Sequence, residues 1–172
     1  MIFILRHAKS DWDSPAVKDF DRPLNDRGRV AAPRIGAYFM SKHHRCDIVL
    51  CSTARRTRET FDLIKPFMPD GIMAEFDDKL YLAEPTYLLS CLRALRDDLK
   101  SAMIIGHNPG LEQLAHSLIV RTRDLEATTV YRRMSDKFST CALAVVGSSS
   151  KTWAGLKPGR CELLDFVRPR DL

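Results

Sequence analysis

The sequence predicts an α/β fold with three layers, in which helices cover both faces of a mostly parallel central sheet. Three short apolar runs, "MIFILRH", "CDIVLCST" and "SAMIIGHNPG", each end on polar residues before a stretch with helical periodicity. Such alternation of strands and helices is typical of layered α/β proteins with a parallel sheet. The chain has 172 residues, the size of one ordinary domain, so we expect a single domain over residues 1–172.

Four segments carry apolar residues that recur every three or four positions, the period of a helix with one buried face. They span residues 26–42, 54–67, 85–99 and 109–120. Asn25 and the pair Glu84-Pro85 precede two of these segments and are typical of helix starts. We therefore expect four helices, each after a strand or a loop of the sheet.

The last third of the chain has a different pattern. The runs "TCALAVVG" and "CELLDFV" have no helix between them, and the turn-rich "SSSKTWAGLKPG" joins them. This arrangement predicts a hairpin or two adjacent strands near an edge of the sheet. Residues 121–137 are charged and have little periodicity, so a short helix and a loop both stay open there.

Composition narrows the class of protein and its partners. The longest apolar runs are far shorter than the ~18 residues of a spanning helix, and Arg6 interrupts the N-terminal run too early for a signal peptide. The five cysteines show no C-x-x-C spacing, which favours reduced thiols over disulfides or a zinc site. We expect a cytoplasmic protein with no membrane partner.

The net charge of +5 is modest, and Lys and Arg are spread along the chain. A weak attraction for anions follows. The sequence has no basic stripe interleaved with aromatic residues, so we expect no nucleic-acid partner.

Polar side chains follow each of the three predicted parallel strands. Arg6 and His7 come after the first, residues 52–58 after the second, and His107 with Asn108 after the third. Ligands of such sheets gather at the carboxyl ends of the strands, where these groups are expected to meet. A neutral imidazole can attack phosphorus as a nucleophile, and arginines hold several phosphoryl oxygens at once. The pattern therefore predicts a phosphoryl-transfer site.

The segment "STARRTRET" also indicates that an anion binds at the carboxyl ends of the predicted strands. It puts Arg55, Arg56 and Arg58 in the first turns of a predicted helix, where the helix dipole favours negative charge. A bound phosphate would offset this unfavourable placement and would also use the free N–H groups of the helix start.

These residues together resemble a known family. Arg6-His7 followed by Ala8, the pattern S-x-x-x-R-x-x-x-T from Ser52 to Thr60, and Gly106-His107 resemble the histidine phosphatase superfamily, with its phosphoglycerate-mutase-like fold. The stretches "RHAKSDW", "DRPLNDRG", "GHNPGL" and "FVRPRDL" resemble its SixA-type phosphohistidine phosphatase branch. The resemblance covers most of the chain and is weakest over residues 121–137.

The resemblance implies roles for several residues. His7 would be the nucleophile that becomes phosphorylated, and Arg6, Arg56 and His107 would complete the phosphate pocket. Arg22 would be an additional phosphate or substrate contact, unless it serves only the turn before the first helix. Larger relatives often have Asn soon after the nucleophile, where this chain has Asp13, whose role stays open.

The general acid is the least defined part of the site. Glu84 lies in about the right region, and Asp19 and Asp21 are alternatives. A phosphohistidine substrate would lessen the need for any acid, because its imidazole leaves readily once protonated. Arginines supply the positive charge that Mg²⁺ supplies elsewhere, so we expect neither a metal nor a cofactor.

The function that we favour from the sequence is a phosphatase with a covalent phosphohistidine intermediate on His7. Its substrate would carry phosphate, with phosphohistidine of a signalling protein preferred, because the short connections between motifs leave no room for a long lid over the site. A small-molecule phosphomonoesterase on the same site is one alternative. A phosphoprotein-binding module that has lost catalysis is another.

Overall fold

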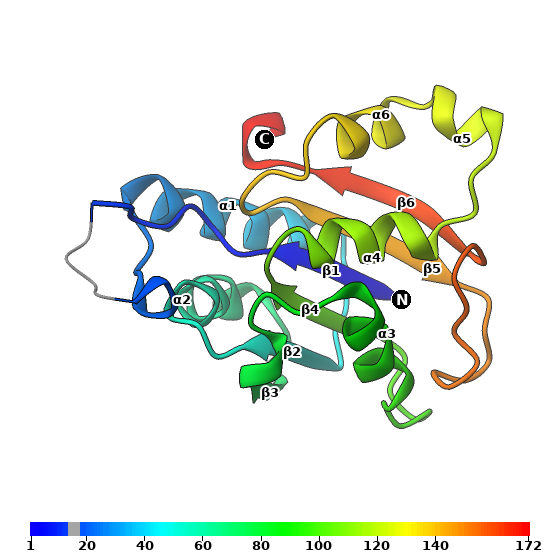
Figure 1. The fold of residues 1–172 in the computed structure, drawn as a ribbon, viewed down its shortest axis with the longest axis horizontal. Helices are drawn as coiled ribbons and strands as arrows, with labels where there is room; N and C mark the ends of the chain where they lie inside the picture. Colours follow the sequence, from blue (N-terminus) through cyan, green and yellow to red (C-terminus); the bar gives the residue numbers. More distant parts are fainter. Residues whose placement is uncertain (14–17) are drawn as a thin grey trace.

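A single six-stranded sheet with helices on both faces forms the centre of the computed structural model (Figure 1), which describes residues 1–13 and 18–172. The strand order is β3-β2-β4-β1-β5-β6. The strands are β1 (Ile2–Arg6), β2 (Ile48–Ser52), β3 (Met73–Asp77), β4 (Ala102–Gly106), β5 (Leu143–Ser148) and β6 (Cys161–Val167). The first four pair in parallel, and β5 and β6 join them antiparallel. The predicted class, α/β with a mostly parallel sheet, is confirmed.

The strand β1 shows why the sheet needs helices on both faces. Ile2 and Ile4 point into one apolar cluster and Phe3 and Leu5 into the other, and all four side chains are fully buried. Successive side chains of a strand alternate between faces, so an uninterrupted apolar run indicates a strand covered on both sides.

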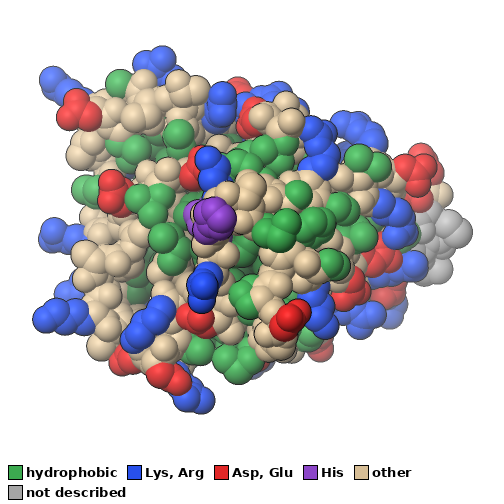
Figure 2. Space-filling view, turned by 180° about the vertical axis from the view of Figure 1, so that it is seen from behind, with side chains coloured by type: hydrophobic (Ala, Val, Ile, Leu, Met, Phe, Trp, Pro, Cys, Tyr) green, Lys and Arg blue, Asp and Glu red, His purple; other side chains and the backbone are tan. Residues whose placement is uncertain are grey.

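Each face has its own helices. The helices α1 (Asp26–Ser41) and α2 (Arg55–Ile64) cover the face of Phe3 and Leu5. The other face packs against α3 (Pro85–Arg93), α4 (Gly110–Leu118) and α6 (Thr129–Asp136), and α4 lies in front of the sheet in Figure 1. Seen from behind, the surface mixes hydrophobic side chains with many Lys and Arg side chains (Figure 2).

The first turn of α1 packs directly on the chain that follows β1. Asn25 caps this helix by accepting a hydrogen bond from the backbone N–H of Gly28, as the sequence predicted. A Cβ atom at Gly28 would lie 2.2 Å from the carbonyl oxygen of Lys9, so only glycine permits this approach. The contact holds the start of α1 next to the segment that carries His7.

Several helix ends differ from the sequence-based expectation. The helix expected over residues 54–67 ends at Ile64 and continues as a 3-10 turn over Lys65–Phe67, because Pro66 has no N–H for a helical bond. The helix expected to reach residue 99 ends at Arg93. Beyond it, Trp153 donates hydrogen bonds to Asp97 and to the carbonyl of Leu99, which draws this segment away from the helix axis.

The C-terminal part follows the prediction more closely. β5 and β6 are adjacent antiparallel strands, and β6 forms an edge of the sheet. Residues 121–137, which the sequence left open, contain the short helix α5 (Arg123–Ala127) and α6, and threonine side chains cap both. All five cysteines are free thiols. Among the residues that the structure describes, none of the helices combines the length and apolar character needed to span a membrane.

Candidate active site

His7 lies directly after β1, at the carboxyl end of the parallel strands. Parallel register pairs Arg6 with Gly106, and the backbone N–H of His7 donates to the Gly106 carbonyl, so His7 and His107 emerge side by side. Their ring centroids are 5.2 Å apart. The carboxyl edge of the sheet therefore brings two histidines, distant in sequence, into one buried cluster.

Hydrogen bonds orient the His7 ring and assign its proton. Nδ1 lies 2.7 Å from the carbonyl oxygen of Ala8, which only accepts, so Nδ1 carries the hydrogen. Nε2 then holds a lone pair, and the Nε–H of Arg56 donates to it over 3.3 Å. Burial, aided by the positive charges of Arg56 and Arg6, lowers the pKa of His7 well below its usual 6.5. His7 is thus a neutral imidazole whose Nε2 is unprotonated and accepts a hydrogen bond from Arg56.

Arg56 comes from the first turn of α2 and is almost completely buried. Its Nη1 and Nη2 donate to the backbone oxygen and the carboxylate of Asp19 over 2.6 and 2.9 Å. Its Nη2 also lies 3.2 Å from Nδ1 of His107. One guanidinium therefore touches both histidines and fixes their relative positions.

His107 follows β4 and is held between Arg56 and Ser52. Because a guanidinium only donates, Nδ1 of His107 accepts, and its Nε2–H donates to the Ser52 hydroxyl over 2.9 Å. Burial, aided by the charge of Arg56, lowers the pKa of His107 to about 3. At neutral pH this ring is an uncharged hydrogen-bond donor.

Arg6 adds a further positive charge beside the two histidines. Its Nη1 donates to the carbonyl oxygen of Phe138 over 2.7 Å, which anchors the side chain to the loop before β5. Among the described residues, Arg6 Nε is a buried donor with no partner. Burial lowers the pKa of Arg6 from its ordinary value, and the nearby Glu112 carboxylate opposes this shift. An unpaired donor beside a nucleophile is available to an incoming anion.

A carboxylate closes one side of the cluster. Asp19 accepts hydrogen bonds from Arg22 Nη1 at 2.6 Å, Arg56 Nη2 at 2.9 Å and the Tyr81 hydroxyl at 2.6 Å. These donors, above all Tyr81, lower the pKa of Asp19 to about 2. Asp19 is therefore ionised at neutral pH, and with its side chain nearly half exposed it lies at the mouth of the site.

Arg22 also lies at the mouth of the site, next to Asp19. Its Nη2 donates to Ser10 and its Nε to the Asp11 carbonyl, and the residue is buried. The exposed Trp12 ring lies 3.3 Å from its guanidinium carbon, in a cation–π arrangement. Arg22 thus joins the turn before α1 to the site, so the structural and the substrate-binding interpretations both fit its geometry.

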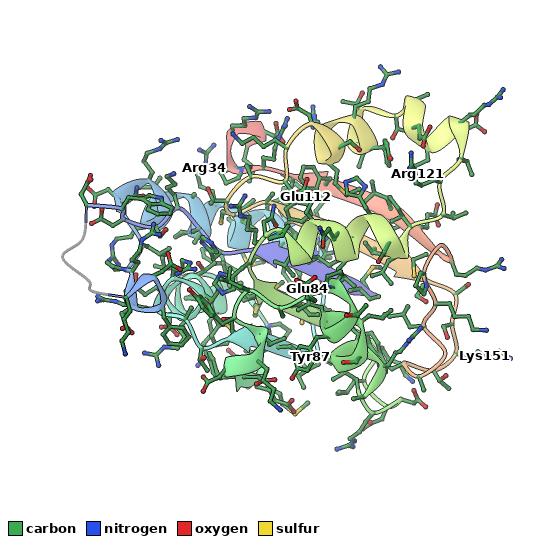
Figure 3. All side chains as sticks on the ribbon, in the orientation of Figure 1. Arg34, Glu84, Tyr87, Glu112, Arg121 and Lys151 are labelled. Atoms are coloured by element: carbon green, nitrogen blue, oxygen red, sulfur yellow. The ribbon has the colours of Figure 1, made fainter. Side chains whose placement is uncertain are left out.

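The possible general acids are placed very differently. Asp19 is ionised and has no proton to donate, whereas Asp21 is exposed on the same 3-10 turn. Glu84 is exposed and forms the N-cap position of α3, where Figure 3 labels it. None of the three residues is buried.

Some residues of the cluster had received no role from the sequence. Ser52 and Thr60 belong to the pattern that selected Arg56, and here Ser52 accepts from His107 while Thr60 Oγ1 accepts from the Ala8 N–H. Tyr81 precedes Glu84 in "LYLA" and packs edge-on against the His107 ring. The serine and threonine were signalled by the spacing itself, whereas nothing near Tyr81 in sequence indicated its role.

Neighbouring polar residues stay outside the cluster. Arg55 is exposed and pairs with Glu59, as expected for a rim residue. Asp13 is exposed, and its backbone N–H donates to the Asp11 carboxylate. Within residues 1–13 and 18–172, no three His, Cys, Asp or Glu side chains are grouped so as to hold a metal ion.

The arrangement suits nucleophilic chemistry on an anion. Arg6 and Arg56 lie beside a neutral imidazole, and Arg22 lies at the mouth, where Asp19 accepts from both Arg22 and Arg56. The positive charges of these arginines attract an anion, and an unprotonated imidazole nitrogen can act as a nucleophile. The structure thus brings together His7, Arg6, Arg56 and His107, whose catalytic roles stay predictions from the resemblance.

Comparison with known proteins supports the assignment to the histidine phosphatase superfamily. The family model of the histidine phosphatase superfamily (branch 1) matches residues 2–81. An uncharacterised protein of Mycobacterium tuberculosis strain H37Rv is 31% identical over 166 residues, which cover 96% of this chain and 100% of that protein.

Solved structures agree over nearly the whole chain. A crystal structure of the "putative phosphohistidine phosphatase SixA" from Agrobacterium tumefaciens is 32% identical, covers 98% of this chain and 97% of its own, and has a TM-score of 0.80. A structure of the protein histidine phosphatase SixA in complex with tungstate has a TM-score of 0.77 at 21% identity, covering 99% and 97% of the two chains, and shares the fold. The chain therefore belongs to the histidine phosphatase superfamily, branch 1.

Proposed function

We propose that this protein is a phosphohistidine phosphatase, which takes the phosphoryl group from a phosphohistidine side chain of another protein onto His7 and then hydrolyses it. The observation that carries the proposal is the fixed tautomer of His7. Its Nδ1–H is held by the Ala8 carbonyl, and its Nε2 lone pair faces Arg56. A neutral, oriented imidazole beside a guanidinium is the arrangement that nucleophilic attack on phosphorus requires.

In the first step, the Nε–H of Arg56 would shift from His7 Nε2 to a phosphoryl oxygen, and the freed Nε2 lone pair attacks the phosphorus atom while the phosphorus–nitrogen bond of the substrate breaks. When the second ring nitrogen of the substrate carries a proton, the leaving group departs as neutral imidazole. Arg6 Nε and the Arg56 guanidinium are placed to donate to the phosphoryl oxygens, whose charge they stabilise.

In the second step, a water molecule attacks phospho-His7. A phosphorus–oxygen bond forms, the bond to Nε2 breaks, and the electron pair returns to the ring nitrogen. The water loses its proton to solvent, phosphate leaves, and neutral His7 is restored. The burial and positive neighbours that lower the pKa of His7 favour this neutral product.

The acid–base properties of the site favour phosphohistidine over a phosphate ester. An alkoxide is a poor leaving group and needs a proton from a general acid. Asp19 is ionised, and the His107 ring, with its pKa at about 3, is uncharged near neutrality. Glu84 is exposed at the start of α3. A substrate that brings its own proton on the leaving imidazole avoids this deficiency.

The structural neighbours support the same choice. Two of them are described as SixA phosphohistidine phosphatases, and one was crystallised with tungstate, a tetrahedral oxyanion like phosphate.

Mass spectrometry under alkaline quench tests the proposal. Wild type, His7→Ala and the control His116→Ala, whose ring packs against Tyr131 instead, would be incubated with phosphoramidate or with a phosphorylated histidine domain. We expect phosphate on His7 in wild type and His116→Ala and none in His7→Ala, with release of phosphate from the domain. Absence of label and of phosphate release in every sample would overturn the covalent mechanism and favour a binding module.

A parallel assay with glycerol 2-phosphate, an ester whose alkoxide leaving group needs a proton, separates the two enzymatic alternatives. We expect slow ester turnover that Glu84→Gln leaves nearly unchanged. If wild type hydrolysed the ester efficiently and left the phosphorylated domain intact, the protein would be a phosphomonoesterase. A loss of ester turnover in Glu84→Gln, with labelling of His7 retained, would identify Glu84 as its acid.

A further inference from the structure

A broad groove of about 870 Å³ leads away from the active site. It starts at Arg6 and runs between α1 and the C-terminal 3-10 turn, Pro169–Asp171. Arg34, on the α1 side of this groove, is labelled in Figure 3 near the C-terminal segment. Arg6 is the residue that the groove shares with the pocket that would hold the phosphoryl group.

One wall of the groove is a face of α1. Arg27, Val30, Ala31 and Arg34 all line it, at helical positions i, i+3, i+4 and i+7, which lie along one side of a helix. Both arginines are exposed, and Val30 is 64% exposed. This stripe lies on the solvent-facing side of the helix, where polar residues are expected, although Ala31 also packs against the core. Its two exposed arginines give this wall a positive charge.

The opposite wall carries the same charge. Lys137, after α6, and Arg170, in the C-terminal turn, line it, and Lys9 lies near the site itself. Together with Arg6 and the two arginines of α1, six basic side chains line the groove against one carboxylate, Asp26. Among the ion pairs of the described residues, only a 3.5 Å contact between Arg170 and Asp136 involves any of these six.

We propose that this groove docks an acidic segment of the phosphoprotein substrate, next to its phosphohistidine. The inference rests on the proposed function, since it names the surface by which that same site would select its substrate. Charge complementarity identifies the partner: a row of unpaired cations that ends at a phosphate pocket fits carboxylates flanking a phosphorylated side chain. No aromatic side chain lines the groove among the described residues, so the stacking surface typical of single-stranded nucleic-acid sites is missing.

Two phosphohistidine peptides of equal length test the inference, one with glutamates beside the phosphohistidine and one with glutamines in their place. The double variant Arg27→Glu/Arg34→Glu reverses the α1 wall without touching the catalytic cluster. Arg27→Lys/Arg34→Lys keeps the charge. The matched control, Lys151→Glu/Lys157→Glu, makes the same charge change near the opposite end of the molecule, where Figure 3 labels Lys151.

We expect the double reversal to lower kcat/KM for the glutamate peptide by about tenfold at low salt, the lower range of electrostatic steering. The glutamine peptide and phosphoramidate should be hydrolysed as by wild type. The lysine variant and the control should retain the preference for the glutamate peptide, and high salt should remove it from all proteins.

Equal activity of wild type and the double reversal on the glutamate peptide would overturn the docking inference alone, because hydrolysis of both peptides would still support the proposed function. Hydrolysis of neither peptide, with His7 still labelled by phosphoramidate, would overturn the proposed function and the inference with it. Inhibition of wild type by single-stranded RNA that the double reversal abolishes, without any preference between peptides, would assign the groove to nucleic acid instead.

Discussion

Two buried arginines, Arg56 in the parallel half of the sheet and Arg168 at its antiparallel edge, have the same burial and very different partners. Arg168 makes two parallel hydrogen bonds with the Asp171 carboxylate, at 3.0 and 3.1 Å, three residues along the chain. Arg56 contacts both ring nitrogens that face the site and a half-exposed carboxylate from a distant loop.

The comparison shows that two similarly buried guanidinium groups have different roles. The guanidinium of Arg168 is matched by two carboxylates, Asp171 in the same 3-10 turn and Asp136 at 3.4 Å, so its role is to close the C-terminal end of the chain. Arg56 lies where the ends of parallel strands meet, and the one carboxylate that it contacts, Asp19, is shared with Arg22. Two arginines share a single carboxylate at the site, whereas two carboxylates serve Arg168, which separates an anion site from a structural ion pair.

The largest expected effect concerns Arg56. Arg56→Ala should lower kcat/KM for phosphoramidate by about two to three orders of magnitude, because a guanidinium that stabilises the transferred phosphoryl group is lost. Arg56→Lys should recover part of this loss, since lysine supplies a charge but no planar fork. The control is Arg55→Ala, one residue away and exposed, which should stay within about twofold of wild type. Similar losses of kcat/KM in Arg56→Ala and Arg55→Ala would contradict the assignment of Arg56 to the anion site.

Arg168→Ala should affect stability instead. It removes the charged hydrogen-bond partner of Asp171, an exposed residue whose side chain is 13% exposed, and we expect a loss of about 2 kcal/mol. Urea unfolding would measure this loss, and kcat per folded molecule should be unchanged. Arg170→Ala, at an exposed neighbour, should change the free energy of unfolding by less than about 0.5 kcal/mol. A lower kcat in folded Arg168→Ala would contradict a purely structural role for Arg168.

The smallest effect concerns the carboxylate that pairs with Arg56. The pKa of Asp19 is lowered from 3.8 to about 2 in the folded protein. Because the folded pKa is the lower one, the ion pair stabilises the fold above pH 4, and this contribution is lost as the pH falls toward 2. The side chain is nearly half exposed, so solvent screening limits the contribution to about 1 kcal/mol or less.

Unfolding of Asp19→Asn by urea at pH 7 and at pH 3 would measure this contribution. The variant should be slightly less stable than wild type at pH 7, and the difference should shrink at pH 3. Asp21→Asn, on the same 3-10 turn, serves as the control. A difference that grows on acidification would show that the sign of the linkage is wrong.

Much of the site was predictable because its residues follow strand ends directly. His7 and His107 each come one residue after a buried strand, and the spacing from Ser52 selected Arg56 over its neighbours. The positions of Asp19 and Tyr81 were not predictable in this way. Both lie on loops, and they meet through a hydrogen bond between residues 62 positions apart.

The helix boundaries also show that contacts between residues far apart in the sequence could not be predicted. The start of α1 was readable from Asn25, because capping is a contact between residues three positions apart. The end of α3 was not, since Trp153 binds the segment after it from the far end of the chain. Only the packed structure brings that tryptophan to its partners.

The sequence by itself determined the class of fold, the order of its parallel strands along the chain and the histidines that meet at the strand ends, because these depend on periodicity and on residues adjacent to strands. The tertiary structure decided which nitrogen of His7 is free, why Asp19 is ionised, and where six basic side chains form one groove. Protonation and local charge depend on burial and on neighbours from distant segments, which chain order does not record.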